Sequence, residues 1–313
     1  MKKLWPLALV GVLAACSGSE KGGPGQEAKL RGDECYSNRD FDGAVRAYTE
    51  AIEADANLVA AYNNRGNSYV GLEQTDKALA DYDKAVALAP DDARWLTNRG
   101  WVLSGNGDLA KARADLDEAV KLDPKFFLAA YRRGKIRWAQ NDLEGADADL
   151  STACGLNPQI AAAWAALTEL RVRKNAPDAA IETADAGLKA KPGNADILNY
   201  RGLAWYAKKD FARAAADFTA ALKENRNHRH AWFNRALMSC EEKKYAEAIA
   251  DLDEAVRISP KNADAWKLRG YAKFASGKGD DCLPDYRKAL EVAPKDWPDR
   301  KEIEEWLKKD KPK

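Results

Sequence analysis

Small and apolar positions recur along this chain at a fixed spacing of 34 residues. In each repeat a glycine or another small residue is followed twelve places later by a second small residue, and four places after that, in most repeats, by a larger apolar one. The glycines are Gly32, Gly66, Gly100, Gly134, Gly202 and Gly270, with Thr168 and Ala236 in the two gaps. A proline closes six of the eight repeats. Because small residues let helices approach closely and proline ends them, the pattern predicts repeated helix pairs.

This pattern resembles the tetratricopeptide repeat, a helix-turn-helix of 34 residues. The resemblance covers about nine-tenths of the chain and implies an all-α, right-handed α-solenoid whose first helices line a concave groove. The eight predicted repeats are 25–58, 59–92, 93–126, 127–160, 161–194, 195–228, 229–262 and 263–296.

The end of the solenoid needs a polar-faced cap, because each repeat buries its apolar faces only by stacking on a neighbour. Residues 297–313 predict such a capping helix and a tail, since Ile303, Trp306 and Leu307 form a narrow apolar stripe among charges. The last repeat is irregular, because Pro284 interrupts its second helix.

An arginine occupies position 7 of seven repeats, where the family usually has leucine, and only Leu167 keeps the apolar form. A buried charge needs a partner, and an aspartate stands sixteen residues later in six of these repeats. The predicted pairs are Arg65 with Asp81, Arg99 with Asp115, Arg133 with Asp149, Arg201 with Asp217, Arg235 with Asp251, and Arg269 with Asp285. Pairing with the preceding repeat's aspartate fits fewer repeats. An arginine ladder for anionic ligands is the functional alternative.

Two exceptions bear on these pairs. The repeat with Leu167 has Thr183 in place of the aspartate, so it lacks both halves of the pair. Arg31 alone breaks the correspondence, because it stands opposite Ala47. The pattern therefore predicts pairs within repeats that brace the two helices.

Composition indicates a folded chain that does not bind nucleic acid. Of 313 residues, 46% are hydrophobic and 32% charged, and the formal net charge is +1. Phosphate backbones require a basic stripe, which such a balance does not supply.

The first sixteen residues, MKKLWPLALVGVLAAC, form a charged start, an apolar run and a small-residue end. The end, Leu13 to Cys16, resembles the lipobox of bacterial lipoproteins. The resemblance implies a signal peptide over 1–15, a diacylglycerol or palmitate-type lipid on Cys16 as the only attached group, and a flexible tether over 16–26. Ser17 favours the periplasmic face of an outer membrane. An ordinary secretory leader is the alternative.

The residues offer little chemistry for catalysis. The cysteines beyond the leader, Cys35, Cys154, Cys240 and Cys282, match no metal spacing and are expected to be free thiols rather than disulfides. His228 and His230 lie two apart and would not share a helix face. No phosphate loop or nucleophile elbow occurs. We expect no metal, no cofactor and no enzymatic activity.

Aromatic, amide and basic residues occupy the first-helix positions that hold ligands in peptide-binding members of the family. The predicted groove residues are Asn63, Asn64, Asn67, Asn98, Trp101, Tyr131, Arg132, Lys135, Trp138, Tyr206, Phe233 and Tyr271. Three of them, Asn67, Asn98 and Arg132, match the family's carboxylate clamp, whereas Asn63 and Leu128 replace its two lysines. The alternative for each aromatic residue is packing in the core, which is the expectation for Trp164, Trp232 and Trp266.

Together these features predict a non-catalytic, membrane-tethered scaffold that binds protein or peptide segments in its groove. The resemblance extends to envelope lipoproteins that help to assemble cell-envelope complexes. The alternative is a regulator that docks a periplasmic enzyme, such as a peptidoglycan hydrolase or synthase. The residues do not select the partner.

Overall fold

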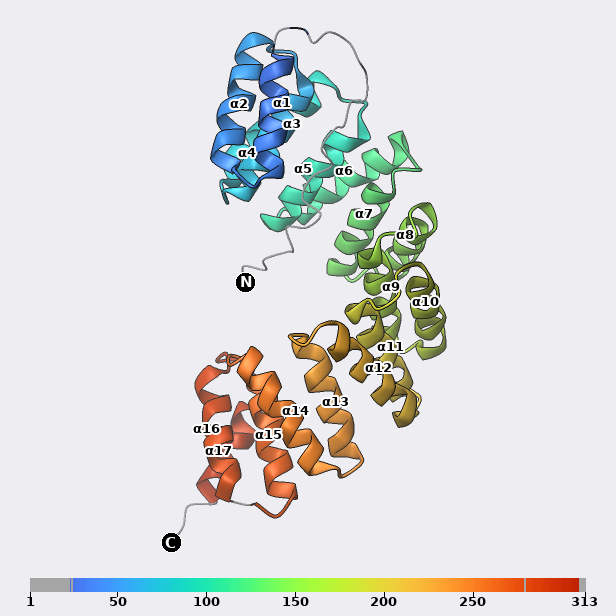
Figure 1. Ribbon diagram of the computed structural model, residues 1–313, viewed down its shortest axis with the longest axis vertical. Coiled ribbons are helices and arrows are strands. Elements are labelled where there is room, and N and C mark those ends of the chain that lie inside the picture. Colours follow the sequence, from blue (N-terminus) through green and yellow to red (C-terminus); the bar gives the residue numbers. More distant parts are fainter. Residues whose placement is uncertain (1–22, 24, 279, 310–313) are drawn as a thin grey trace. The chain divides into compact units, whose positions relative to one another are not determined.

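The computed structural model describes residues 23, 25–278 and 280–309, and within them every regular element is a helix. The helices form successive antiparallel pairs (Figure 1), which confirms the predicted all-α, solenoid-like fold. The chain divides into two compact units, Met1–Asn157 and Pro158–Lys313, which we call the N-terminal unit and the C-terminal unit. The leader, Cys16 and most of the predicted tether lie outside the described residues.

The N-terminal unit contains four helix pairs, in which odd-numbered first helices alternate with even-numbered second helices. They are α1 (Gln26–Ser37), α2 (Phe41–Ala54), α3 (Val59–Gly71), α4 (Thr75–Leu88), α5 (Ala93–Gly105), α6 (Leu109–Leu122), α7 (Phe127–Ala139) and α8 (Leu143–Leu156). Each pair falls within one predicted repeat.

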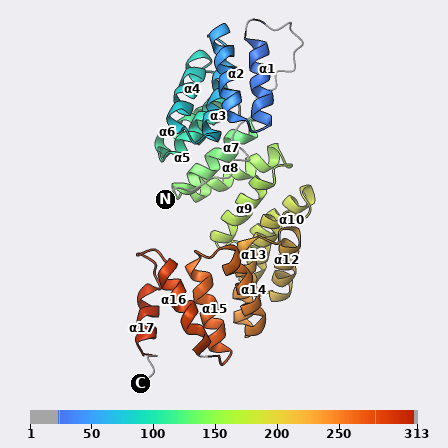
Figure 2. The same cartoon turned by 60° about the vertical axis from the view of Figure 1, so that its left-hand side comes forward.

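The C-terminal unit continues the same alternation and ends in an additional helix (Figure 2). Its elements are α9 (Ala161–Arg173), α10 (Pro177–Ala190), α11 (Ala195–Ala207), α12 (Phe211–Glu224), α13 (Arg229–Glu241), α14 (Tyr245–Ile258), α15 (Ala263–Ala275), the 3-10 helix η2 (Asp280–Cys282), α16 (Leu283–Val292) and α17 (Arg300–Lys309).

The last helix pair differs from the others because a proline delays the start of its second helix. Pro284 lies in the first turn of α16, so the second helix of this repeat begins late and is only 10 residues long. Helix α17 covers this pair. Ile303 is buried, and the Trp306 ring meets Tyr286 and Phe274 edge-on at centroid distances of 4.9 and 5.5 Å.

Small residues set the distance between paired helices. The alanines of the recurrent small position, from Ala44 to Ala248, are fully buried where the second helix meets the first. At Gly202 a Cβ atom would lie 2.7 Å from the Phe218 ring, so only glycine allows this approach. The sequence periodicity thus reflects direct contact between helices.

The turn between first and second helix has the same backbone conformation in every repeat. Its middle residue has a positive φ: Arg39, Glu73, Gly107, Asn141, Asn175, Lys209, Lys243 and Gly277. Only two of the eight are glycine, although this left-handed region favours glycine. In the first seven repeats the next residue occupies the N-cap position of the second helix, and in four of them it is an aspartate whose side chain accepts a backbone N–H: Asp40, Asp108, Asp142 and Asp210.

Candidate functional site

The structure brings the six arginines together with the aspartates that lie sixteen residues later. Arg65 is representative: its Nε and Nη2 donate to the two carboxylate oxygens of Asp81 at 2.8 and 2.7 Å. All six aspartates are buried, with exposed fractions of at most 8%. The hydrogen bonds that Arg65 donates to Asp81 raise the pKa of Arg65. These bidentate pairs join the two helices of each repeat.

Each of these arginines also reaches back to the second helix of the preceding repeat, sixteen residues earlier. Arg99 Nη1 donates to Asp83 at 2.9 Å, and Arg133 Nη1 donates to Asp117 at 3.2 Å. Asp185 and Asp253 bind Arg201 and Arg269 in the same way, and the hydroxyls of Thr49 and Thr219 accept from Arg65 and Arg235. Sequence reasoning missed these acceptors, although they follow the same period. The arginines therefore link consecutive repeats as well as paired helices.

The two exceptional repeats use other contacts. Thr183, which replaces the aspartate opposite Leu167, accepts a hydrogen bond from Arg171 Nη1 at 2.5 Å. Arg31 pairs with Glu50 at the surface, where both side chains are more than half exposed. The buried bidentate geometry therefore occurs only where both arginine and aspartate are present.

The four asparagines predicted to line the groove are buried inside the N-terminal unit. Asn63, Asn64 and Asn67 have no exposed surface, and Asn98 is 2% exposed. Asn64 Nδ2 donates to Asp33 at 2.9 Å, Asn63 Nδ2 donates to Asn64 at 3.0 Å, and Asn98 Nδ2 donates to Asn63 at 2.9 Å. We call these linked side chains, together with Arg132, the amide chain. Its members come from α1, α3, α5 and α7.

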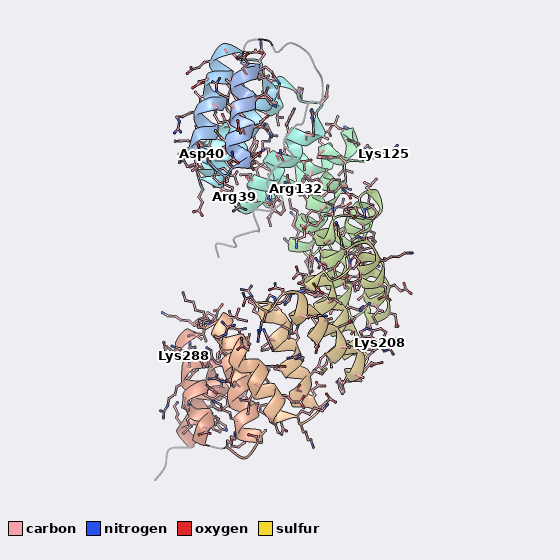
Figure 3. All side chains as sticks on the ribbon, viewed as in Figure 1. Arg39, Asp40, Lys125, Arg132, Lys208 and Lys288 are labelled. Carbon is pink, nitrogen blue, oxygen red and sulfur yellow. The ribbon has the colours of Figure 1, made fainter. Side chains whose placement is uncertain are left out.

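Arg132 ends the amide chain and is also buried, with 1% of its surface exposed. Its Nη1 donates to Asn98 Oδ1 at 2.9 Å and to the Thr97 carbonyl at 3.0 Å. Desolvation lowers its pKa to about 10, against the influence of Tyr82 and Tyr131. Figure 3 labels Arg132 among the first helices of this unit.

The burial of these residues differs from the expectation of a surface clamp. Asn67 Oδ1 accepts from the Tyr82 hydroxyl at 2.6 Å, and Leu128 is buried as well. Asn63, Asn64 and Asn98 bond to one another inside the stack. The helical positions of these residues therefore indicated the correct side of the helix but not how deeply the side chains are buried. As the structure stands, Asn67, Asn98 and Arg132 offer no exposed clamp.

Three predicted groove residues of the N-terminal unit are partly exposed, and we call them the tryptophan face: Trp101, Lys135 and Trp138. Arg132 Cζ lies 5.1 Å from the Trp101 ring centroid, and Lys135 Nζ lies 4.9 Å from that of Trp138. Tyr131 is buried beside them, and its burial raises its pKa. Lys135 therefore adds a positive charge to the aromatic surface of Trp101 and Trp138, whereas Arg132 contacts the Trp101 ring from inside the unit.

The C-terminal unit places its predicted residues on α11, α13 and α15. The Tyr206 hydroxyl donates to Glu241, and Lys209 Nζ lies 5.4 Å from the Tyr206 ring centroid. Phe233 is partly buried. Tyr271 is 46% exposed and borders a pocket of about 310 Å³, which is lined also by Lys267, Leu268, Tyr286, Glu302, Ile303 and Trp306.

Three tryptophans at position 4 pack against the core while their ring N–H groups remain bonded. Trp164, Trp232 and Trp266 donate from Nε1 to the carbonyls of Pro158, Arg226 and Pro260. They are partly buried and contact the alanine-rich clusters of their unit. These contacts agree with a packing role.

The described residues contain no cluster of three His, Cys, Asp or Glu side chains able to hold a metal ion. His228 instead caps α13, since its Nδ1 accepts the Ala231 N–H at 3.1 Å. None of the described helices has the length and apolar character needed to cross a membrane.

Family models match most of the chain. A model described as tetratricopeptide repeat matches residues 63–125, 97–159, 131–195, 166–218 and 206–263, and a TPR repeat model matches 32–73. Among curated proteins, Protein STIP1 homolog of Dictyostelium discoideum is 36% identical over 73 residues, covering 23% of this chain and 13% of that protein. Hsp70-Hsp90 organizing protein 2 of Arabidopsis thaliana is 37% identical over 65 residues, covering 21% and 11%. The chain thus spans only a small part of these relatives.

Solved structures share the fold at low identity. The APC/C hetero-tetramer Cut9-Hcn1 matches with a TM-score of 0.65 at 16% identity, covering 89% of this chain and 55% of that one. PilW, described as a type IV pilus biogenesis factor, matches with a TM-score of 0.58 at 22% identity, covering 65% and 94%. At such identities the likeness concerns the fold alone.

Proposed function

Because the chain belongs to the tetratricopeptide repeat family, we propose that it is a non-catalytic scaffold that binds a segment of another protein against its first helices. The tryptophan face carries this proposal. Trp101 and Trp138 are large aromatic side chains that remain partly exposed on neighbouring first helices. Tryptophan and basic residues are typical of the few side chains that dominate protein interfaces.

The surface favours a segment that combines apolar and acidic side chains. The indole rings supply apolar contact area, and the partly exposed Lys135 places its Nζ 4.9 Å from the Trp138 ring centroid. An acidic side chain of the partner would face this positive charge while its apolar neighbours cover the rings.

Crosslinking in native cells tests where the partner binds. A photoreactive amino acid at position 101 or 138 should capture a protein, whereas the same group at exposed Lys121 on α6 should capture none. Capture from Lys121 with none from positions 101 and 138 would reject the proposed surface.

We further propose that the scaffold is lipidated on Cys16, tethered to the periplasmic face of an outer membrane, and serves assembly of a cell-envelope complex. The order of charged start, apolar run and Leu13-Ala14-Ala15-Cys16 supports this. Labelled palmitate should enter the unmodified chain and not the Cys16→Ser variant. Equal labelling of both chains, or labelling of neither, would contradict lipidation at Cys16.

A further inference from the structure

The turns between first and second helices carry opposite charge in the two units. The four turns of the N-terminal unit, 38–40, 72–74, 106–108 and 140–142, contain one arginine and four acidic residues, a formal charge of −3. The four turns of the C-terminal unit, 174–176, 208–210, 242–244 and 276–278, contain six lysines and two acidic residues, a formal charge of +4. The sets are equal in length and equivalent in the repeat, so the fold does not dictate this difference.

The six lysines lie along one edge of the C-terminal unit, which we call the lysine edge: Lys174, Lys208, Lys209, Lys243, Lys244 and Lys278. The first helices α9, α11, α13 and α15 pack side by side in the same direction, so their C-terminal turns follow one another. Contacts join neighbouring repeats near this edge: Lys208 binds Asp178, Lys209 binds Glu241, and Tyr245 meets Tyr271 with centroids 6.4 Å apart. Figure 3 labels Lys208 on this edge.

The lysines remain available to a partner although some have neighbours. Five of the six are exposed, and Lys209 Nζ lies 3.1 Å from Glu241, with Lys244 Nζ 3.1 Å from Glu242. Exposed pairs of this kind contribute only about 0 to 1 kcal/mol, so a stronger anionic field can replace them.

One position on the edge goes against local stability. Lys244 occupies the N-cap position of α14 and makes no capping hydrogen bond, whereas Asp210 at the equivalent position caps α12. Gln74 and Ala176 also leave their helices without a side-chain cap, but only Lys244 places a positive charge at this N-cap position. A missing cap costs about 0.5 to 2 kcal/mol, and a cation at a helix N-terminus is unfavourable. A residue that is unfavourable for its own helix, as Lys244 is, is expected where that residue serves a function.

Aromatic rings lie beside the lysines. Lys209 Nζ is 5.4 Å from the Tyr206 centroid and 5.7 Å from the Phe211 centroid. At the end of the edge, Tyr271 and Phe274 are 46% and 49% exposed. Aromatic rings among lysines are characteristic of surfaces that meet the membrane–water interface.

We propose that the lysine edge docks on an anionic phospholipid surface, with the lysines at headgroup phosphates and the neighbouring rings at the interface. The turns contribute lysine and no arginine, and arginine is the residue favoured for fixed pairing with the carboxylates of a protein. Lysine suits the diffuse charge of a headgroup layer. The proposal does not depend on lipidation of Cys16 or on the tryptophan face.

Vesicle binding tests the proposal. The full chain carrying Cys16→Ser is mixed with vesicles of phosphatidylcholine alone and with vesicles that also contain phosphatidylglycerol. The edge variant combines Lys209→Gln, Lys243→Gln, Lys244→Gln and Lys278→Gln. A matched variant removes four exposed lysines elsewhere in the same unit: Lys189→Gln, Lys191→Gln, Lys223→Gln and Lys261→Gln. All three chains keep residues 1–15, so any contribution of the leader cancels.

We expect the edge variant to lose about tenfold or more of its partition onto anionic vesicles, because each lysine near such a surface contributes about 1 kcal/mol. The matched variant should lose much less, and binding to neutral vesicles should not change. Equal losses in the two variants, or no loss in the edge variant, would overturn the proposal. Two results together would identify an acidic protein as the partner instead. The unmodified edge would bind neutral and anionic vesicles equally, and it would bind poly-glutamate while the edge variant does not. The double variant Lys209→Gln/Lys243→Gln should show an intermediate loss if the fourfold variant does not fold.

Discussion

At the scale of single residues, a charge at a core position is stabilised by partners that recur with it. Arg99 binds both carboxylate oxygens of Asp115 and also Asp83 on the preceding repeat. All the hydrogen-bonding nitrogens of the guanidinium therefore face an acceptor, which offsets the cost of partial burial. Hydrogen bonds between buried side chains also link the amide chain, from Asp33 through the asparagines to Arg132.

A double-mutant cycle measures the arginine pairs. Arg99→Ala and Asp115→Ala should each lower the free energy of unfolding, the aspartate change by about 2 to 4 kcal/mol, and the two losses should be coupled by about 1 to 3 kcal/mol. The cycle on Arg31 and Glu50, which are 57% and 58% exposed, should give a coupling of about 0 to 0.5 kcal/mol. Equal coupling in the two cycles would contradict the bracing role.

Removal of one link of the amide chain should be costly. Asn63→Ala leaves the buried Nδ2 of Asn98 and Oδ1 of Asn64 without their partner, so denaturant unfolding should show a loss of about 2 to 4 kcal/mol. Asn106→Ala, at an exposed turn, should change stability by less than about 0.5 kcal/mol. An Asn63 variant as stable as the unmodified chain would mean that the chain contributes nothing to folding.

At the scale of the elements, helix pairing and the Arg–Asp register could be predicted from the sequence, because both follow the 34-residue period. The burial of Asn63 and Arg132 could not be predicted. A helical position fixes the direction of a side chain, whereas its burial depends on how closely the neighbouring first helices approach. The left-handed conformation of the turns could not be predicted from the sequence either. Glycine marks it at Gly107 and Gly277, but in the other repeats residues such as Glu73 and Lys243 adopt the same positive φ.

Relief of this turn conformation should stabilise the chain. Glu73 has φ of 59°, so Glu73→Gly should raise the free energy of unfolding by up to about 1 kcal/mol, because glycine adopts this region without a Cβ clash. Asp76→Gly, in the first turn of α4, should lower it by up to about 1 kcal/mol, because the helix gains a glycine and loses an acidic residue near its N-terminus. Two losses of equal size in thermal or denaturant unfolding would contradict the turn account.

At the scale of the whole molecule, near-neutrality conceals a segregation of charge. The formal net charge is only +1, yet equivalent turns carry −3 in the N-terminal unit and +4 in the C-terminal unit. The total charge averages over surfaces whose charges differ in sign. The exposed aromatic residues are likewise divided, with the tryptophan face on one unit and Tyr271 and Phe274 on the other.

The central claim is that Trp101, Lys135 and Trp138 bind a protein segment, and the affinity of the captured segment tests it most directly. The double variant Trp101→Ala/Trp138→Ala should weaken binding about 30-fold or more, since loss of an anchoring residue costs about 2 kcal/mol or more. Lys135→Gln should weaken it several-fold, while Lys121→Gln on exposed α6 should leave the dissociation constant unchanged. Unchanged affinity in the double variant, with all chains folded, would contradict the account.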